Sequence, residues 1–325
     1  MTTFSPTRRG VLAAAAALPF IARAQDSIGG GRPITLVVSY PAGGGADLMA
    51  RLIAPHMAQA LGQSVVVDNK PGASGQLAAQ QVARATPDGS QLLLDASSFA
   101  VNPSLFAKLP YDSDTAFTPL AVLALFPNVL VCTPSYAAKN VRDVIRAAKD
   151  KPGQIAYASS GNGSAQHLAG ALFEQRAGVS LVHVPYKGGG PALNDVMAGQ
   201  VPLFFANVAS SLGHIQGQKL RPLAVTSLRR ARALPDVPTM EEAGVSGYEV
   251  LEWNPILAPA GISPSVKQKL AAAIARAMAE PEVLGRVRSL SGEVFAGGPE
   301  QAAAFLKKQQ GLWAQVVRER KISVG

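Results

Sequence analysis

The chain has 325 residues and a formal net charge of +9 at pH 7. Its lysines and arginines are spread along the chain without basic runs that alternate with aromatic residues, which argues against nucleic acid and favours small anions as partners. The single cysteine, Cys132, excludes an intramolecular disulfide and a cysteine-rich metal site. A chain of this length exceeds the usual size of one domain, so we expect two lobes.

The N-terminal segment has the pattern of a cleaved export signal. An apolar run follows Arg8 and Arg9 and ends at Ala22-Arg23-Ala24, the small-x-small pattern that signal peptidase cuts. The run is too short to cross a membrane, which takes about 20 apolar residues. We therefore expect residues 1–24 to be a signal peptide and the mature, periplasmic chain to begin at Gln25. Both the twin-arginine and the Sec export routes fit the paired arginines.

A glycine-rich loop follows the first predicted strand, residues 34–38. It reads Tyr40-Pro41-Ala42-Gly43-Gly44-Gly45-Ala46-Asp47 and leads into a helix with apolar residues at helical spacing. Glycine lets backbone N–H groups approach a ligand, and a helix N-terminus adds unpaired N–H groups and a positive dipole end. We interpret this loop as an anion-binding site, and the alternative is a flexible turn between strand and helix.

Strand-like and helix-like segments alternate along the rest of the chain. This order predicts an α/β fold in which each lobe is a mixed sheet flanked by helices. The predicted strands after the first are residues 64–67, 91–95, 120–131, 155–158, 181–184, 202–207, 222–226 and 248–258. The predicted helices include residues 47–61, 141–148, 264–279 and 299–320, another ends near residue 85, and residues 102–118 are expected to be irregular.

The apolar stretch 120–131 is broken at Pro127-Asn128, which predicts a strand that passes from one lobe to the other. We therefore expect lobe 1 to contain residues 29–127 and 252–325, and lobe 2 to contain residues 128–251. The ligand cleft is expected between them.

A second glycine-rich loop, Ser160-Gly161-Asn162-Gly163-Ser164, repeats the strand, loop and helix order in the second lobe. Ser164 is expected to cap the helix that follows. Two helix N-termini, one from each lobe, could then face one ligand. On this hypothesis the backbone amides of residues 43–46 and 161–164 supply most of the binding energy.

Several other chemistries find no support in the sequence. Both loops lack the third glycine of a dinucleotide-binding loop, and the chain has neither a Walker lysine nor a Gly-x-Ser-x-Gly nucleophile motif. The four histidines are scattered, so we expect no metal and no cofactor. His167 follows the second loop and could reach the cleft, although helix packing explains a lone histidine equally well.

The ordered set of motifs resembles the Bug family, the extracytoplasmic solute receptors of tripartite tricarboxylate transport systems. The resemblance covers almost the whole mature chain and rests on the signal segment, the two loops above, Asn69-Lys70-Pro71-Gly72-Ala73-Ser74-Gly75, Val184-Pro185-Tyr186-Lys187-Gly188 and Ala233-Leu234-Pro235-Asp236-Val237-Pro238-Thr239. It implies a type II periplasmic-binding-protein fold whose two lobes close on a small carboxylate, held largely by backbone N–H groups and ordered water. The chain departs from the family pattern at Ala206 and Pro255, and both are expected near the cleft.

The loops and the resemblance together define the expected ligand-binding residues. These are Tyr40, Ala42, Gly43, Gly44, Gly45, Asp47, Ser74, Ser98, Ser160, Gly161, Asn162, Gly163, Ser164, His167, Tyr186 and Asn207. The negative charge of Asp47 would repel an anion. We interpret it as a helix cap whose oxygens accept backbone N–H groups, and if it instead faces the cleft it would select an acid that carries an amino group.

Three functions from different classes fit the sequence. The favoured one is a monomeric periplasmic receptor, not an enzyme, that captures a small mono- or dicarboxylate, aromatic acids included, and delivers it to the membrane permease subunits of a tripartite tricarboxylate transporter. A ligand-sensing co-receptor for a signalling system is the second. A secreted hydrolase is the third, and the missing catalytic motifs count against it.

Overall fold

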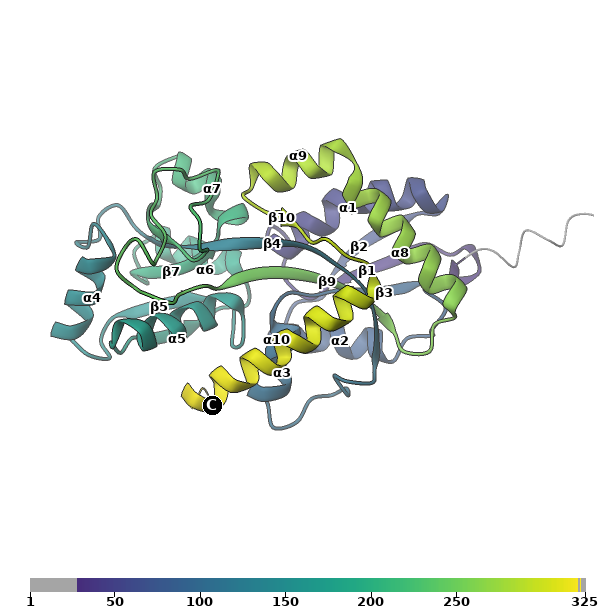
Figure 1. Ribbon diagram of the computed structural model, residues 1–325, viewed down its shortest axis with the longest axis horizontal. Coiled ribbons are helices and arrows are strands. Elements are labelled where there is room, and N and C mark those ends of the chain that lie inside the picture. The colour runs from purple at the N-terminus through teal and green to yellow at the C-terminus, as the bar shows by residue number, and fades with distance from the viewer. Residues whose placement is uncertain (1–27, 321, 323–325) are drawn as a thin grey trace, which may run out of the picture.

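The computed structural model describes residues 28–320 and residue 322. The predicted signal peptide, residues 1–24, and the predicted first mature residue, Gln25, lie outside these residues. Within the described ranges, no helix combines the length and the apolar character that crossing a membrane requires. Two lobes lie side by side and are joined by long strands (Figure 1), which confirms the predicted two-lobe α/β fold.

The first lobe is built on a mixed sheet in the order β2-β1-β3-β9-β4. Its strands are β1 (Ile34–Val38), β2 (Val65–Asn69), β3 (Gln91–Leu94), β4 (Phe117–Cys132), β9 (Leu251–Pro259) and β10 (Glu293–Val294). β1 runs parallel to β2 and β3, and β9 runs antiparallel to β3 and β4. The helices of this lobe are α1 (Gly45–Leu61), α2 (Gln76–Ala83), α3 (Ser98–Leu105), α8 (Pro264–Ala279) and α9 (Pro281–Ser289), with short 3₁₀ turns η1 (Ile28–Gly31) and η2 (Ala73–Gly75).

The second lobe continues the sheet from β4 in the order β7-β5-β6, with β8 also paired to β4. Its strands are β5 (Ala156–Ser159), β6 (Val182–Pro185), β7 (Leu203–Asn207) and β8 (Arg221–Val225). Its helices are α4 (Val141–Asp150), α5 (Ala165–Ala177), α6 (Gly189–Met197) and α7 (Val208–Gln216). β5 lies parallel to β6 and β7, so the loops after these strands leave the same edge of the sheet, where α/β proteins bind ligands.

β4 changes partners where the sequence breaks its apolar run. Pro127 pairs with Leu251 of β9, whereas the next residue, Asn128, pairs with Asn207 of β7. We keep the division of the chain into residues 29–127 with 252–325 and residues 128–251 as a proposal, since this change of partners suits it.

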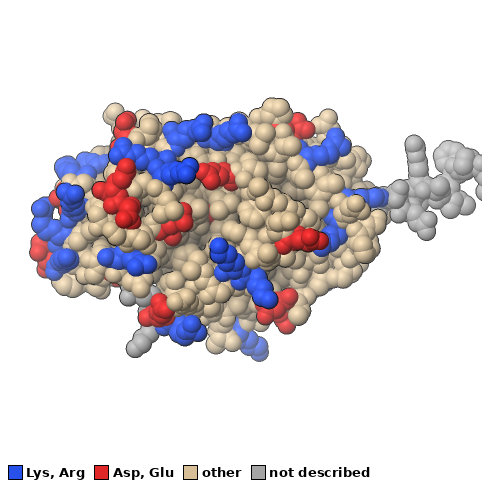
Figure 2. Space-filling view, viewed as in Figure 1, with Lys and Arg blue, Asp and Glu red and all other residues tan. Residues whose placement is uncertain are grey.

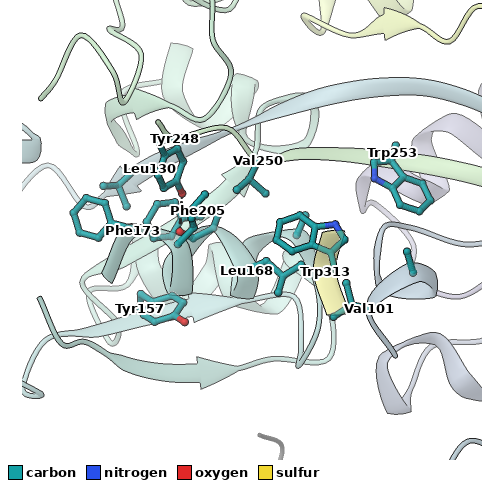
Figure 3. Packing of buried hydrophobic residues seen from close by; sticks show 14 of the residues in the cluster. Val101, Leu130, Tyr157, Leu168, Phe173, Phe205, Tyr248, Val250, Trp253 and Trp313 are labelled. Atoms are coloured by element: carbon teal, nitrogen blue, oxygen red, sulfur yellow. Dashed lines mark hydrogen bonds between the residues drawn. The ribbon is translucent and has the colours of Figure 1, made fainter. Parts of the chain in front are cut away.

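The C-terminal helix α10 (Pro299–Arg320) packs against α3 and β4. Its Trp313 belongs to a buried apolar cluster that also contains Val101 of α3 and Leu168 of α5. Figure 3 shows the indole ring beside both side chains. Since α3 belongs to the first lobe and α5 to the second, the end of the chain packs against both.

Several sequence predictions match the structure and others do not. α8 spans the predicted residues, because the Ser263 hydroxyl caps it and Pro264 suits its first turn. Part of the region predicted to be irregular, residues 102–118, is instead the end of α3, which continues through Pro103 because its apolar side chains are buried against the core. The sequence analysis did not predict α7 and α9.

Charged side chains of both signs are interspersed on the face shown in Figure 2. This distribution agrees with a basic excess that is spread along the sequence.

Candidate functional site

A small cavity lies where loops of both lobes meet. Its volume is about 20 Å³, which is room for roughly one water molecule. The lining residues are Tyr40, Pro41, Gly44, Gly45, Ala46, Ala96, Ser97, Ser160, Ser164, Ala165, Gln166, Gly189, Phe204, Asn207, Ser210 and Glu252. The cleft is therefore closed, and the lobes must separate before a carboxylic acid of several carbons can enter.

Three helices direct their N-termini at this cavity. α1 begins after Gly44, α5 after Ser164 and α7 after Asn207, and all three cap residues line the cavity. Ser164 caps α5 as predicted, because its hydroxyl accepts the His167 N–H at 3.3 Å. The structure thus brings together the two helix N-termini that the sequence predicted and adds a third.

The N–H groups at the very start of each helix have no acceptor within the helix. In α1 these belong to Gly45 and Ala46, and in α5 to Ala165 and Gln166, and all four residues line the cavity. Backbone donors from both lobes, together with the positive ends of the helix dipoles, therefore give the cavity the character of an anion site.

In the first glycine loop, two backbone N–H groups that were expected to bind a ligand have acceptors within the protein instead. The Gly43 N–H donates to Asp47 Oδ2 at 2.9 Å, and the Gly44 N–H donates to the Pro41 carbonyl at 3.3 Å. Ala42 and Gly43 are exposed at the surface. Gly43 has φ +82°, so this loop needs its glycine for the turn, and the donors left for a ligand lie at Gly45 and Ala46.

Asp47 is not the helix cap, which corrects the sequence prediction, because Gly44 occupies the cap position. Its buried carboxylate accepts hydrogen bonds from Gly43, from Arg51 Nε at 3.0 Å and from Asn69 Nδ2 at 2.9 Å. Burial raises the pKa of Asp47, but these hydrogen bonds outweigh burial and hold the pKa below its usual range. Asp47 is therefore an ionised group whose charge is satisfied inside the first lobe, away from the cavity lining.

The second glycine loop is likewise bonded internally. The Gly161 N–H donates to Ser159 Oγ at 3.1 Å, and the Gly163 N–H donates to His167 Nδ1 at 3.1 Å. A Cβ on Gly163 would lie 2.9 Å from a methyl group of Leu105 in the first lobe. This loop therefore serves as a contact between the closed lobes. The N–H groups of Gly161 and Gly163 have acceptors within the protein, and binding of the ligand by these amides stays a prediction.

His167 does not line the cleft. Its ring stacks on that of His183, with centroids 3.8 Å apart, and both line a separate cavity of about 810 Å³. Burial lowers the pKa of His167 to about 4, and burial together with the neighbouring His167 lowers the pKa of His183 to about 3. Both rings are neutral near pH 7, and the packing role explains His167.

The other predicted site residues divide into two groups. Six line the cavity, namely Tyr40, Gly44, Gly45, Ser160, Ser164 and Asn207. Ser98, Ser74, Tyr186 and Asn162 are not among its lining residues.

Three of these residues have partners of their own. Ser98 Oγ accepts the Tyr40 hydroxyl at 3.0 Å, the Ser74 carbonyl accepts Asn102 Nδ2 at 2.9 Å, and the Tyr186 hydroxyl donates to Asp195 Oδ2 at 2.6 Å. Ser98 thus supports the site through Tyr40.

The sequence analysis missed the carboxyl group in the cleft, Glu252. It stands at the start of β9 and is only 7% exposed. Its Oε2 accepts Gln166 Nε2 at 2.6 Å, and the same amide donates to Asn128 Oδ1 at 3.1 Å. Burial raises the pKa of Glu252, and the amides of Asn207 and Gln166 oppose that rise. The signal in the sequence was a single acid inside the apolar stretch that carries the chain between lobes.

Two buried donors at the cavity have no hydrogen-bond partner among the described residues, Ser97 Oγ and Asn207 Nδ2. Both side chains are nine-tenths or more buried. Asn207 Nδ2 and Glu252 Oε1 would each lie 3.2 Å from a Cβ on Gly45, so both atoms lie close to the N-terminus of α1. Unpaired buried donors are costly, and they point to an acceptor that arrives with a ligand.

The two departures from the family pattern do not reach the cavity. Neither Ala206 nor Pro255 is among its lining residues. Ala206 is fully buried in the core of the second lobe, and the Pro255 carbonyl accepts the Asp95 N–H. Neither residue therefore lines the cavity, although Asn207, which follows Ala206, does.

Residues 49–322 match the model of a known family, described as the tripartite tricarboxylate transporter family receptor. The chain belongs to this receptor family. The solved structure of the periplasmic binding protein BugD is 35% identical to the receptor over 90% of this chain and 98% of that chain, with a TM-score of 0.86. Family members are thus periplasmic solute-binding receptors.

Two further solved structures come from Rhodopseudomonas palustris. Rpa4515, solved with adipate, is 34% identical over 90% of the receptor and 98% of its own chain, with a TM-score of 0.87. MatC, solved with bound malate, is 31% identical over 88% and 99% of the two chains, with a TM-score of 0.84. The receptor therefore shares its fold, over nearly its full length, with two proteins whose structures contain small carboxylates.

Proposed function

We propose that this receptor captures a small carboxylate in the periplasm and delivers it to the membrane permease subunits of a tripartite tricarboxylate transporter. We infer the ligand class from two buried donors without partners, Ser97 Oγ and Asn207 Nδ2, which lie beside three helix N-termini. A carboxylate is a pure acceptor and would satisfy both. The bound adipate and malate of the two relatives support the same class.

The strength of such a site is compatible with micromolar binding. A hydrogen bond to a charged group contributes roughly 1.5 to 3 kcal/mol, and a micromolar dissociation constant requires about 8 kcal/mol. Four backbone amides and two side-chain donors line the cavity. They leave a margin for the cost of closing the lobes, so the site needs no lysine or arginine.

Calorimetry with C4 to C9 mono- and dicarboxylates, aromatic acids included, tests this proposal. At ligand concentrations of about 100 times the dissociation constant, linkage predicts about 2.7 kcal/mol of added stability. Sugars and polyamines serve as negative controls. Stabilisation by these neutral or cationic compounds, with no response to any acid, would refute the proposed ligand class.

A variant at Asn207 tests the observation itself. Asn207→Asp keeps the oxygen that caps α7, accepting the Ala209 N–H, but replaces the unpaired donor with an acceptor. We expect acid binding to fall at least tenfold. Asn140→Asp is the matched control, because Asn140 caps α4 at an exposed position in the same way; equal losses in both variants would contradict the role of Asn207.

Delivery and export need separate measurements. Deletion of the gene should abolish uptake of the bound acid by cells, and purified receptor should run as a monomer.

N-terminal mass analysis of the periplasmic protein should find Gln25 first, and retention of Arg8 and Arg9 there would refute cleavage of the signal.

A further inference from the structure

A second hollow, separate from the cleft, lies where β4 and β9 cross between the lobes. We call it the arginine groove, and its volume is about 700 Å³. Its lining includes residues 227–232, which follow β8 in the second lobe, and parts of α9 and β10 in the first. Pro127 of β4, at the point where that strand changes partners, also lines it. The groove is therefore built by both lobes.

Four arginines line the arginine groove, and three of them have no partner. Arg230 Nε donates to Glu242 Oε2 at 2.8 Å. Among the described residues, the side chains of Arg229, Arg232 and Arg288 form no ion pair and no hydrogen bond. All three are exposed. Because a guanidinium binds a carboxylate through two parallel hydrogen bonds, each can take a carboxylate from another molecule.

Two acidic residues, Glu249 and Glu293, also line the arginine groove, and both are exposed. Neither belongs to an ion pair within the described ranges. A continuous anionic surface, such as a membrane, would bring negative charge against these two carboxylates, and like charges in contact are unfavourable. A polypeptide can place its acidic side chains at the arginines alone. The mixed charges therefore favour a polypeptide over a membrane.

Apolar side chains and a strand edge in the arginine groove also suit a polypeptide. Leu228 is 62% exposed, and Leu284 and Val294 are partly buried in the lining. β10 pairs with β4 only, so in the part of the chain that the structure describes no strand covers its other edge. Extended peptides add to such edges through backbone hydrogen bonds, and arginine is enriched in protein interfaces.

We propose that the arginine groove is a docking site for an extended segment of a partner protein in which Asp or Glu residues accompany apolar ones. The carboxylates of this segment pair with the three free arginines, and an apolar side chain covers Leu228. Ser291, which also lines the groove, accepts the Ala233 N–H across the lobes at 2.8 Å, so the segment contacts both lobes in their closed arrangement. This inference goes beyond the proposed function, because it holds whichever compound the cleft binds.

Selection from a random peptide library displayed on phage, with the full mature protein as the target, tests the inference. We expect the selected peptides to be enriched in Asp and Glu, and their binding to weaken as salt is added. The triple variant Arg229→Gln/Arg232→Gln/Arg288→Gln keeps polar side chains but removes the charges. It should bind synthetic copies of these peptides at least about tenfold more weakly than wild type, measured by fluorescence anisotropy.

The matched control replaces three exposed arginines outside the groove lining and removes the same net charge. It is Arg84→Gln/Arg142→Gln/Arg318→Gln, and it should keep the affinity of wild type. Since all six substituted side chains are exposed, both variants should fold.

Three results would overturn the inference. The first is a set of selected peptides without an acidic excess, or a library that yields no binder. The second is an equal loss of affinity in the two triple variants, which would indicate attraction by net charge alone. The third comes from vesicles of phosphatidylglycerol: if they bind wild type, lose that binding with the groove variant, and no peptide binds, the groove faces a membrane and not a polypeptide.

Discussion

Two buried carboxyl groups, Asp47 and Glu252, lie near the N-terminus of α1 and have opposite settings. Asp47 has a guanidinium, a side-chain amide and a backbone N–H as partners, and its pKa lies below the usual range. Glu252 accepts a hydrogen bond from the Gln166 amide and has no cationic partner in the cleft lining, and burial raises its pKa. The first carboxylate holds a loop in place, and the second lines the cavity between the lobes. The partners of a buried acid, more than its place in a motif, therefore decide its role.

The largest expected effect is a difference in the free energy of unfolding when each carboxyl group is removed in turn. Asp47→Ala leaves the buried donors of Gly43 and Asn69 without an acceptor, and we expect a loss of about 2 to 4 kcal/mol in the free energy of unfolding. Arg51 is half exposed, so solvent screening reduces the contribution of its ion pair with Asp47 to this loss. Glu252→Gln replaces a carboxyl group that has no cationic partner in the cleft lining and should change stability by less than about 1 kcal/mol. Urea unfolding of both variants, without ligand, checks this; equal losses would contradict the distinction.

A third buried acid, Asp95, extends the comparison to pH. Burial raises the pKa of Asp95 to about 6, although hydrogen bonds from Ser39, Ala96 and Ser98 oppose the rise. Because the pKa is higher in the folded state than the ordinary value of 3.8, the folded protein binds more protons between these values. Stability should therefore fall by about 3 kcal/mol as pH rises from about 4 to about 6.

Asp95→Asn should flatten this pH dependence while the contribution of Asp47 remains. Asp47 acts in the opposite direction, since a lowered pKa contributes stability above the unfolded value that is lost as pH falls through the folded one. Thermal unfolding across pH 3.5 to 7 measures both contributions. If the pH profile of Asp95→Asn is unchanged, a group other than Asp95 causes the loss of stability with rising pH.

The two glycine loops should differ in their tolerance of a methyl group. Gly163 has φ +72°, and an added Cβ would press on Leu105 across the closed cleft, so Gly163→Ala should cost about 1 to 3 kcal/mol and favour the open form. Gly44 has φ −77° and its nearest neighbour would be 3.4 Å away. Gly44→Ala should cost no more than about 1 kcal/mol, the usual loss at a helix cap. Chemical unfolding and small-angle scattering compare them, and similar effects would refute the role of Gly163 at the lobe contact.

The fold was largely predictable because local patterns agreed with it. Apolar runs marked β1 and β4, and Ser164 and Pro264 marked the starts of helices by mechanisms that act within a few residues. The meeting of two helix N-termini also followed from the repeated order of strand, loop and helix.

The details of the site were less predictable, because they depend on contacts between distant residues. Gly43 and Gly163 have the expected glycine conformation, but the acceptors that occupy their N–H groups, on Asp47 and His167, become visible only in three dimensions. Glu252 meets Gln166 across 86 residues of chain. No local pattern identifies such a pair, and so the carboxyl group in the cleft was missed.

The position of Trp313 also gives the protein an optical reporter of its own movement. Its indole ring lies beside Val101 of one lobe and Leu168 of the other, and the only other tryptophan, Trp253, is buried within β9. When the lobes separate, the Trp313 ring must move away from Val101, from Leu168 or from both. The emission of this single residue therefore follows the opening and closing of the cleft without an attached dye.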